Sequence, residues 1–144
     1  MTATIIDGKI IAAEVRAEAQ IEVKKFVELY KTNPCLAVVL VGENPASQVY
    51  VRTKSKMAKE IGMDVEDHIK DINISEKELI DLINQLNNND KVNGILVQLP
   101  LPDHIDSRVI IDEIDPMNDL CLDVRQYDYY RVIYHTYKRL CEVV

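Results

Sequence analysis

The chain has 144 residues, with 24 acidic against 17 basic side chains and a formal net charge of −7. This length fits one domain that can bury a core, and the hydrophobic fraction of 47% is ordinary for a globular protein. The acidic charge balance disfavours nucleic acid or an anionic membrane as the main partner.

The cysteines and histidines give no sign of a metal site. Cys35, Cys121 and Cys141 have no metal-ligand spacing and leave one odd thiol under any pairing, which suits a reducing compartment. The three histidines are equally scattered. The N-terminal residues lack a secretory signal pattern, and no apolar run approaches the roughly 18 residues of a membrane span. We therefore expect a cytoplasmic protein with no membrane segment.

The first predicted element is a long amphipathic helix that follows Asp7-Gly8. Apolar residues recur there at helical spacing, and charged residues fill the opposite face. The apolar face comprises Ile10, Ile11, Val15, Ala19, Val23, Phe26, Val27 and Tyr30. The helix must end before Asn33-Pro34, because a proline disfavours helical backbone in the residue before it. The β-branched run Leu36–Val41 then predicts a strand.

A second helix is expected directly after this strand. Asn44 is a good N-cap, and Pro45 sits at the first helical position, where its missing N–H costs nothing. Gly62 is a suitable residue to end the helix. Tyr50 and Lys54 then lie one turn apart on the same helical face.

Further strands and helices continue the alternation. Ser75 and Glu78 form a capping-box pattern that begins a helix, and Gly94–Val97 is a continuous apolar strand of the kind buried on both faces. Two prolines make Gln98–Pro102 a rigid, non-helical loop. The other predicted elements are a weaker strand over Met63–Ile69, the end of the Ser75 helix at Asn87–Asp90, and a short helix capped by Asp106 that carries Val109, Ile110 and Ile114 and stops at Pro116.

This order of elements predicts an α/β fold with an open, mainly parallel sheet flanked by helices. In such sheets, ligands bind outside the carboxyl ends of the strands. Two segments, Gly42–Lys54 and Gln98–Pro102, follow such strand ends. If their strands are neighbours, Tyr50, Lys54 and Gln98 converge in one crevice.

Each of these three side chains also has an ordinary alternative role. An exposed lysine is most often solvated, but a lysine in a partly buried pocket beside other cations can act as an acid–base group. The ring of Tyr50 fits a core or rim position as well as a stacking surface for a heteroaromatic ligand. The amide of Gln98, at the end of a buried strand, needs hydrogen-bond partners that the loop backbone can also supply.

Three motifs, in order and in register, carry a resemblance to a known family: VGENPAS at Val41–Ser47, YVRTKSK at Tyr50–Lys56 and GILVQLPLP at Gly94–Pro102. From about Ile5 to Pro116 the chain resembles the catalytic domain of the bifunctional methylenetetrahydrofolate dehydrogenase/methenyltetrahydrofolate cyclohydrolase (FolD) family. The resemblance implies an enzyme that interconverts 5,10-methylene-, 5,10-methenyl- and 10-formyl-tetrahydrofolate, with NADP for the redox step.

The resemblance also implies roles for the converging side chains. Lys54 matches the catalytic lysine that assists hydrolysis at the one-carbon bridge, Tyr50 matches the residue that stacks on the folate, and Gln98 matches a residue that hydrogen-bonds near the lysine and tunes it. These three are the catalytic candidates. The candidates for binding tetrahydrofolate derivatives are Tyr50, Val51, Arg52, Thr53, Lys54, Val97, Gln98, Leu99 and Pro100.

One departure from the family pattern falls after Pro116. The family has a segment there whose second aspartate binds the pterin ring; Asp119 matches its first aspartate, but Cys121 stands where the second belongs. A thiol does not offer the paired acceptors that a carboxylate presents to an aminopyrimidine edge. A weak or absent pterin anchor is therefore expected.

A second departure is the nucleotide-binding (Rossmann) domain that follows in the family. The chain holds only four glycines and no glycine-rich turn between a strand and a helix, so we assign no cofactor-binding residue. Hydride transfer needs a cofactor held against the substrate, so NADP-linked oxidation by this chain alone is not expected. Family dimers form between nucleotide domains, so a homodimer is not assumed.

We divide the chain into a folate-binding catalytic domain, residues 1–117, and a divergent tail, residues 118–144, which is either helical or disordered. The tail contains five of the seven tyrosines, namely Tyr127, Tyr129, Tyr130, Tyr134 and Tyr137. The expected residual activity is hydrolysis of methenyltetrahydrofolate. The alternatives are an inactive fragment or weak folate-binding module of the same fold, and a generic α/β regulatory domain in which Tyr50, Lys54 and Gln98 stay apart.

Overall fold

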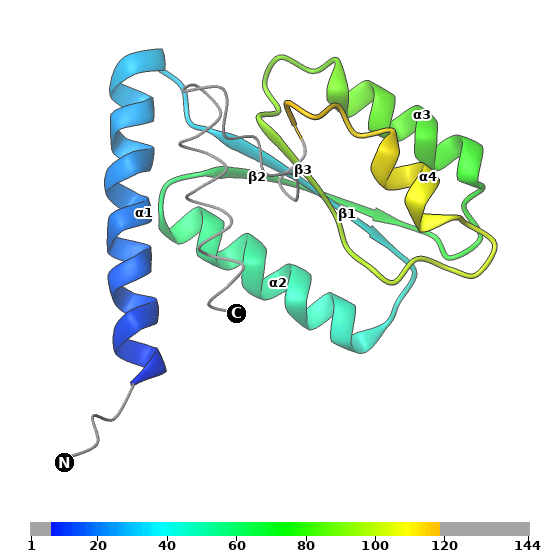
Figure 1. The fold of residues 1–144 in the computed structure, drawn as a ribbon, viewed down its shortest axis with the longest axis horizontal. Helices are drawn as coiled ribbons and strands as arrows, with labels where there is room; N and C mark the ends of the chain where they lie inside the picture. The colour runs from blue at the N-terminus through cyan, green and yellow to red at the C-terminus, as the bar shows by residue number, and fades with distance from the viewer. Residues whose placement is uncertain (1–6, 119–144) are drawn as a thin grey trace, which may run out of the picture.

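A parallel three-stranded sheet with helices on both faces forms the domain, in the computed structural model that describes residues 7–118 (Figure 1). The strand order is β2-β1-β3, so the two later strands flank the first. The open parallel α/β sheet predicted from the sequence is therefore confirmed. The elements are α1 (Gly8–Tyr30), β1 (Cys35–Val41), α2 (Pro45–Glu60), β2 (Asp64–Lys70), α3 (Glu76–Asn87), β3 (Gly94–Val97) and α4 (Ser107–Asp112). The predicted tail lies outside the described residues, apart from Asn118.

The central strand β1 divides the hydrophobic core into two halves. All seven of its residues are buried, and successive side chains point to opposite faces of the sheet. On the face covered by α1 and α2 the core takes Leu36, Val38 and Leu40. On the face covered by α3 and α4 it takes Ala37, Val39 and Val41. Burial on both faces explains why β1 reads as an uninterrupted apolar run.

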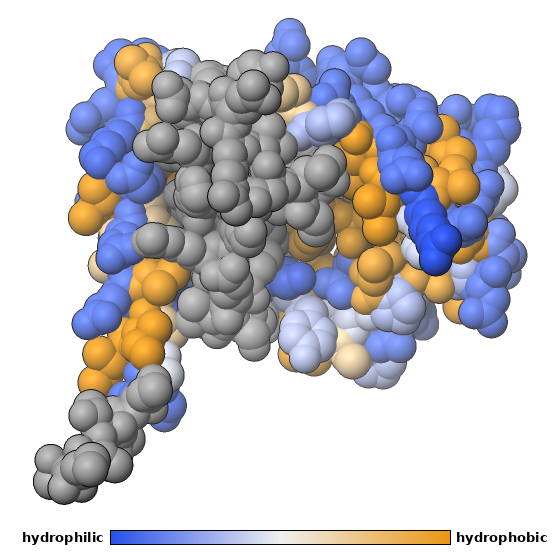
Figure 2. Space-filling model, viewed as in Figure 1, coloured by the Kyte–Doolittle hydropathy of each residue, from blue (hydrophilic) through white to orange (hydrophobic). Residues whose placement is uncertain are grey.

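Helix α1 is held by a narrow stripe of buried side chains. Ala19, Val23 and Phe26, spaced by four and three residues, pack into the core beside α2. Ile10 and Ile11, which the helical pattern places on the apolar face, are 58% and 44% exposed. Figure 2 shows apolar side chains in orange along this helix. Within residues 7–118 no helix, α1 included, has the length and apolarity to cross a membrane.

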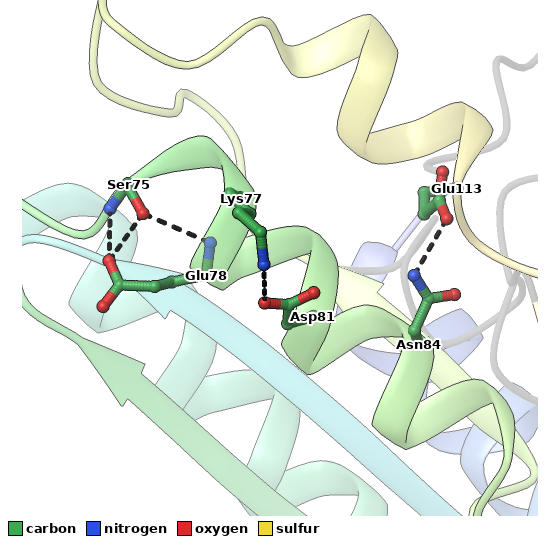
Figure 3. A network of polar contacts seen from close by, with 6 residues as sticks. All are labelled: Ser75, Lys77, Glu78, Asp81, Asn84 and Glu113. Atoms are coloured by element: carbon green, nitrogen blue, oxygen red, sulfur yellow. Dashed lines mark hydrogen bonds and ion pairs between the residues drawn. The ribbon is translucent and has the colours of Figure 1, made fainter.

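The predicted capping box of α3 is present. The Ser75 hydroxyl accepts a hydrogen bond from the Glu78 backbone N–H at 3.2 Å, and the Glu78 carboxylate accepts one from the Ser75 N–H at 2.9 Å (Figure 3). The Ser75 hydroxyl also donates to the Glu78 carboxylate at 2.6 Å, and this bond, together with the one from the Ser75 N–H, lowers the pKa of the Glu78 carboxyl. Lys77 pairs with Asp81 at 2.8 Å one turn further on. The start of α3 is thus determined by local sequence alone.

Helix α4 is shorter than predicted, because it ends at Asp112 and leaves Ile114 beyond it. The cause is the neighbouring helix α3. The Asn87 amide donates to the Glu113 carbonyl at 2.9 Å, and its oxygen accepts from the Asp115 N–H at 3.0 Å. Asn84 also donates to the Glu113 carboxylate at 2.9 Å (Figure 3). These side chains take over backbone groups that a longer helix would pair internally.

The buried thiol of Cys35 predicts a pH dependence of stability. Burial, with smaller contributions from Glu66 and Asp64, raises the pKa of this thiol from 9.0 to about 11. Between these values the unfolded thiol ionises while the folded one stays protonated, so the free energy of unfolding falls as the pH rises. We expect Cys35→Ala to lose this part of the decline, measured by urea unfolding below pH 9 and near pH 11. An identical pH dependence in both proteins would contradict it.

Candidate active site

The site begins where β1 passes into α2. Gly42 has a φ of +81°, a backbone conformation that glycine adopts without strain, and it turns the chain out of the sheet. The Asn44 side chain then accepts hydrogen bonds from the N–H groups of Ala46 and Ser47 at 3.0 and 3.2 Å, and Pro45 occupies the first helical position. Helix α2 therefore starts directly outside the carboxyl end of β1.

Lys54 and Gln98 meet at this edge of the sheet. The Lys54 ammonium Nζ donates to the Gln98 amide oxygen Oε1 at 3.4 Å, across a sequence separation of 44 residues. Both side chains are half-buried. The Gln98 N–H also donates to the Val39 carbonyl at 2.9 Å, so the residue that follows β3 stays attached to β1. Two of the three side chains expected to converge, Lys54 and Gln98, therefore meet.

The amide of Gln98 is held at both ends. Its nitrogen Nε2 donates to the Leu99 carbonyl at 2.6 Å, which leaves its oxygen facing Lys54. The peptide bond between Leu99 and Pro100 is cis. The loop contact suggested for Gln98 from sequence and its contact with the lysine thus coexist, one on each end of the amide.

Apolar surface borders the amine. Tyr50, one turn before Lys54 on α2, is 49% exposed, and its neighbour Val49 is also exposed. Leu99 is exposed on the opposite loop. The Tyr50 hydroxyl forms no hydrogen bond with any of residues 7–118, so the phenol does not join the contact between Lys54 and Gln98. Its ring is instead available to a flat ligand.

The remaining predicted binding residues divide by burial. Val51 and Val97 have their side chains in the core, on opposite faces of the sheet. Thr53 is half-buried and donates its hydroxyl to the Val49 carbonyl at 2.8 Å. Pro100 is exposed on the loop after β3. The valines therefore belong to the core, while Pro100 is exposed to a ligand.

Arg52 lies on the other flank of α2, in a groove beside β2. There the buried Ser55 hydroxyl donates to the Asp67 carboxylate at 2.7 Å, and the Lys59 ammonium lies 4.0 Å from the same carboxylate. None of the sequence motifs indicates a role for this cluster. Its one signal was the four-residue spacing of Ser47, Val51 and Ser55, the buried stripe of α2.

A hollow of about 600 Å³ lies between the end of β2 and α3, away from the predicted site residues. It includes Glu78 and Asp81, whose carboxylates are bound to Ser75 and Lys77. An amine and an amide converge at Lys54 and Gln98, which makes this pair the candidate site. The carboxylates of the hollow are already bound to neighbouring residues, and among them Asp71 accepts from the Asn73 N–H at 2.8 Å.

The start of α2 does not fit the pyrophosphate of a nicotinamide cofactor. A dinucleotide pyrophosphate is bound by free N–H groups at a helix N-terminus after a glycine-rich turn. At the start of α2 the Asn44 side chain occupies two of these N–H groups, and Pro45 lacks one. Among residues 7–118 no group of three or more histidine, cysteine, aspartate or glutamate side chains is arranged to hold a metal ion.

The fold and this contact define an α/β domain with a lysine–glutamine pair at the carboxyl edge of a parallel sheet. Residues 6–120 match the family model of the tetrahydrofolate dehydrogenase/cyclohydrolase catalytic domain. The chain belongs to this family.

Relatives of known sequence agree. The chain is 52% identical over 116 residues to the bifunctional protein FolD of Halothermothrix orenii. This alignment covers 81% of this chain and 41% of the relative. The chain is 56% identical over 114 residues to the FolD protein of Moorella thermoacetica, covering 79% and 40%. The chain thus spans about two-fifths of the length of these relatives.

Solved structures show the same similarity. The bifunctional FolD enzyme of Campylobacter jejuni superposes with a TM-score of 0.77 at 43% identity, covering 81% of this chain and 41% of that one. A 5,10-methylenetetrahydrofolate dehydrogenase from the silkworm Bombyx mori gives 0.79 at 39% identity, covering 83% and 41%. A Trypanosoma brucei dehydrogenase–cyclohydrolase, solved with NADP and an inhibitor, gives 0.77 at 33% identity, covering 83% and 41%.

Proposed function

We propose that this domain binds a tetrahydrofolate derivative and promotes the hydrolysis of 5,10-methenyltetrahydrofolate to 10-formyltetrahydrofolate. The observation that carries the proposal is the 3.4 Å contact between Lys54 Nζ and Gln98 Oε1 at the carboxyl edge of the sheet. The proposal is supported by the relatives that share this domain, which are bifunctional FolD proteins.

The proposed chemistry needs one group that takes and returns a proton. Water adds to the bridging carbon between the two folate nitrogens, and a proton must leave that water. Loss of that proton leaves a hydroxyl on the carbon. The bond from the carbon to N5 then breaks, N5 receives a proton, the hydroxyl releases its own proton to solvent, and the formyl group remains on N10, so one proton is released overall. In its unprotonated form the Lys54 amine accepts the first proton and then, as an ammonium, donates it to the departing nitrogen.

Gln98 supports this role by positioning the amine. Its oxygen accepts from Nζ, and its nitrogen is bound to the Leu99 carbonyl, so the amide cannot turn without losing a hydrogen bond. A fixed acceptor holds the lysine amine at the carboxyl edge of the sheet, where we propose that the folate binds. The exposed ring of Tyr50 provides a face on which the pterin stacks.

Oxidation of methylenetetrahydrofolate is not part of the proposal. At the start of α2, beside the proposed site, Asn44 and Pro45 leave no free N–H pair for the cofactor phosphates. The proposal for this chain is therefore a hydrolase activity and folate binding, with the redox step assigned to longer relatives.

The test measures the two properties on the whole chain. We expect the purified protein to accelerate the loss of the methenyl absorbance above the buffer rate, and calorimetry to detect binding of a folate analogue. When the purified protein is incubated with methylenetetrahydrofolate and NADP, we expect no NADPH to form.

The outcomes separate the competing functions. Binding without hydrolysis would favour a folate-binding module over an enzyme. No binding heat at millimolar analogue, together with a hydrolysis rate equal to that of buffer, would contradict the proposal altogether and favour an inactive fragment.

A further inference from the structure

Strand β2 forms one edge of the described sheet. At the start of β2 the Asp64 N–H donates to the Pro34 carbonyl, and at its end the Lys70 carbonyl accepts from the Gly42 N–H. The backbone groups of the even-numbered residues of β2 therefore point toward β1. Val65, Asp67 and Ile69 therefore direct their N–H and C=O groups away from β1. Within residues 7–118 no strand pairs with this outer edge.

The side chains of β2 are complementary to a second, antiparallel copy of the same strand. The strand reads Asp-Val-Glu-Asp-His-Ile-Lys from residue 64 to residue 70. With Asp67 opposite itself, Asp64 faces Lys70 of the second copy, Val65 faces Ile69, and Glu66 faces His68. Each pair recurs twice by symmetry, and opposite charges across antiparallel strands are stabilising.

Only this register suits both the backbone and the side chains. Pairing must match outward-facing residues with each other, as Val65 with Ile69 and Asp67 with Asp67 do. A shift by one residue turns the backbone groups of one strand away. A shift by two residues in either direction places Glu66 opposite Glu66 or His68 opposite His68, and brings Asp67 against an apolar side chain.

In this register the carboxylate of Asp67 faces the same carboxylate of the second copy, and each already has partners that offset its negative charge. The Asp67 carboxylate accepts from the Ser55 hydroxyl at 2.7 Å and lies 4.0 Å from the Lys59 ammonium, so α2 of each copy offsets its charge. Next to it, Ile69 is 67% exposed, and pairing covers this side chain with Val65 of the second copy. An edge strand with no partner strand, as β2 is within residues 7–118, favours association with another strand. Here the pattern of charges favours β2 of a second copy as that partner.

We propose that β2 is a homodimerisation edge, at which two copies join their sheets into one in the order β3-β1-β2-β2-β1-β3. The interface lies on the opposite edge from β3, so it leaves Lys54 and Gln98 accessible. It also involves only residues of this domain. An edge of seven residues buries little area, so the dimer is weak and its population depends on concentration.

Charge reversal at the ends of β2 tests the register. Sedimentation velocity of the full chain, from micromolar to near-millimolar concentration, is expected to show a monomer–dimer equilibrium. Asp64→Lys alone or Lys70→Asp alone places like charges in both end pairs, and each is expected to weaken association about tenfold or more. The double variant restores opposite charges and is expected to recover the wild-type dissociation constant.

A second variant tests the edge itself. Ile69→Pro removes an N–H that points outward and leaves the bonds to β1 in place, so we expect a folded monomer at all concentrations. Circular dichroism checks the fold of every variant, since Asp64→Lys also removes a 3.3 Å hydrogen bond from Asn33. A monomeric wild-type chain, a dimer that persists in Ile69→Pro, or a double variant that stays as weak as the single ones would each overturn the proposal.

Discussion

Lys54→Met is expected to lower the rate of methenyltetrahydrofolate hydrolysis by about 10²–10⁴-fold, the usual contribution of one acid–base group. Methionine keeps an unbranched side chain of similar length and a high helix propensity, so helix α2 is expected to stay folded. The substitution removes the amine that we propose to accept the proton from water and donate it to N5. The hydrogen bond to Gln98 is lost with it.

A matched control comes from the same helix. Lys56 is two residues away, and its side chain is 77% exposed and pairs with Glu60 at 3.8 Å. Lys56→Met makes the same chemical change at a lysine that does not contact Gln98, and it is expected to keep the wild-type rate. Both variants are compared by initial rates at saturating substrate, with circular dichroism as the check of folding. Equal rates for Lys54→Met and the wild type would rule out the proposed role of the amine.

The largest effect on stability is expected from the core between α3 and the sheet. Ile83→Ala is expected to lower the free energy of unfolding by about 2–5 kcal/mol, because Ile83 is fully buried and its removal leaves a cavity beside Leu79 and Ile95. A domain of this size has only about 5–15 kcal/mol to lose. Urea unfolding followed by circular dichroism measures the change.

The control for this variant is Ile21→Ala, also on a helix but 54% exposed. It removes the same atoms from a position that makes no cavity, and alanine favours the helix slightly. We expect a change within about 0.5 kcal/mol, of either sign. If both substitutions lowered the unfolding free energy equally, the division of the core around β1 would be incorrect.

Features that depend on neighbours in sequence were predicted well. Asn44 and Pro45 start α2 as expected, and the capping box of Ser75 and Glu78 forms with both hydrogen bonds. Strand β3 has the predicted bounds. In each case the decisive interactions lie within a few residues, so a short stretch of sequence contains both partners.

Features that depend on distant partners were predicted less completely. Ile114 lies outside α4 because Asn87, on another helix, binds the backbone that follows it. Arg52 and Lys54 belong to the same helix, yet Arg52 lies in a groove with Asp67 of β2 and not beside Lys54. Helical spacing indicates which residues share a face, but not which neighbouring strand that face meets.

Residue types and their periodicity alone determined the α/β class, the helix starts and the buried strands, since hydrophobic alternation and capping are local properties. The tertiary structure decided that β1 lies between β2 and β3, and this order brings Lys54 to Gln98 while leaving the far edge of β2 without a partner strand among residues 7–118. Strand order depends on how the helices pack over both faces of the sheet, and that packing joins side chains from segments far apart in the chain.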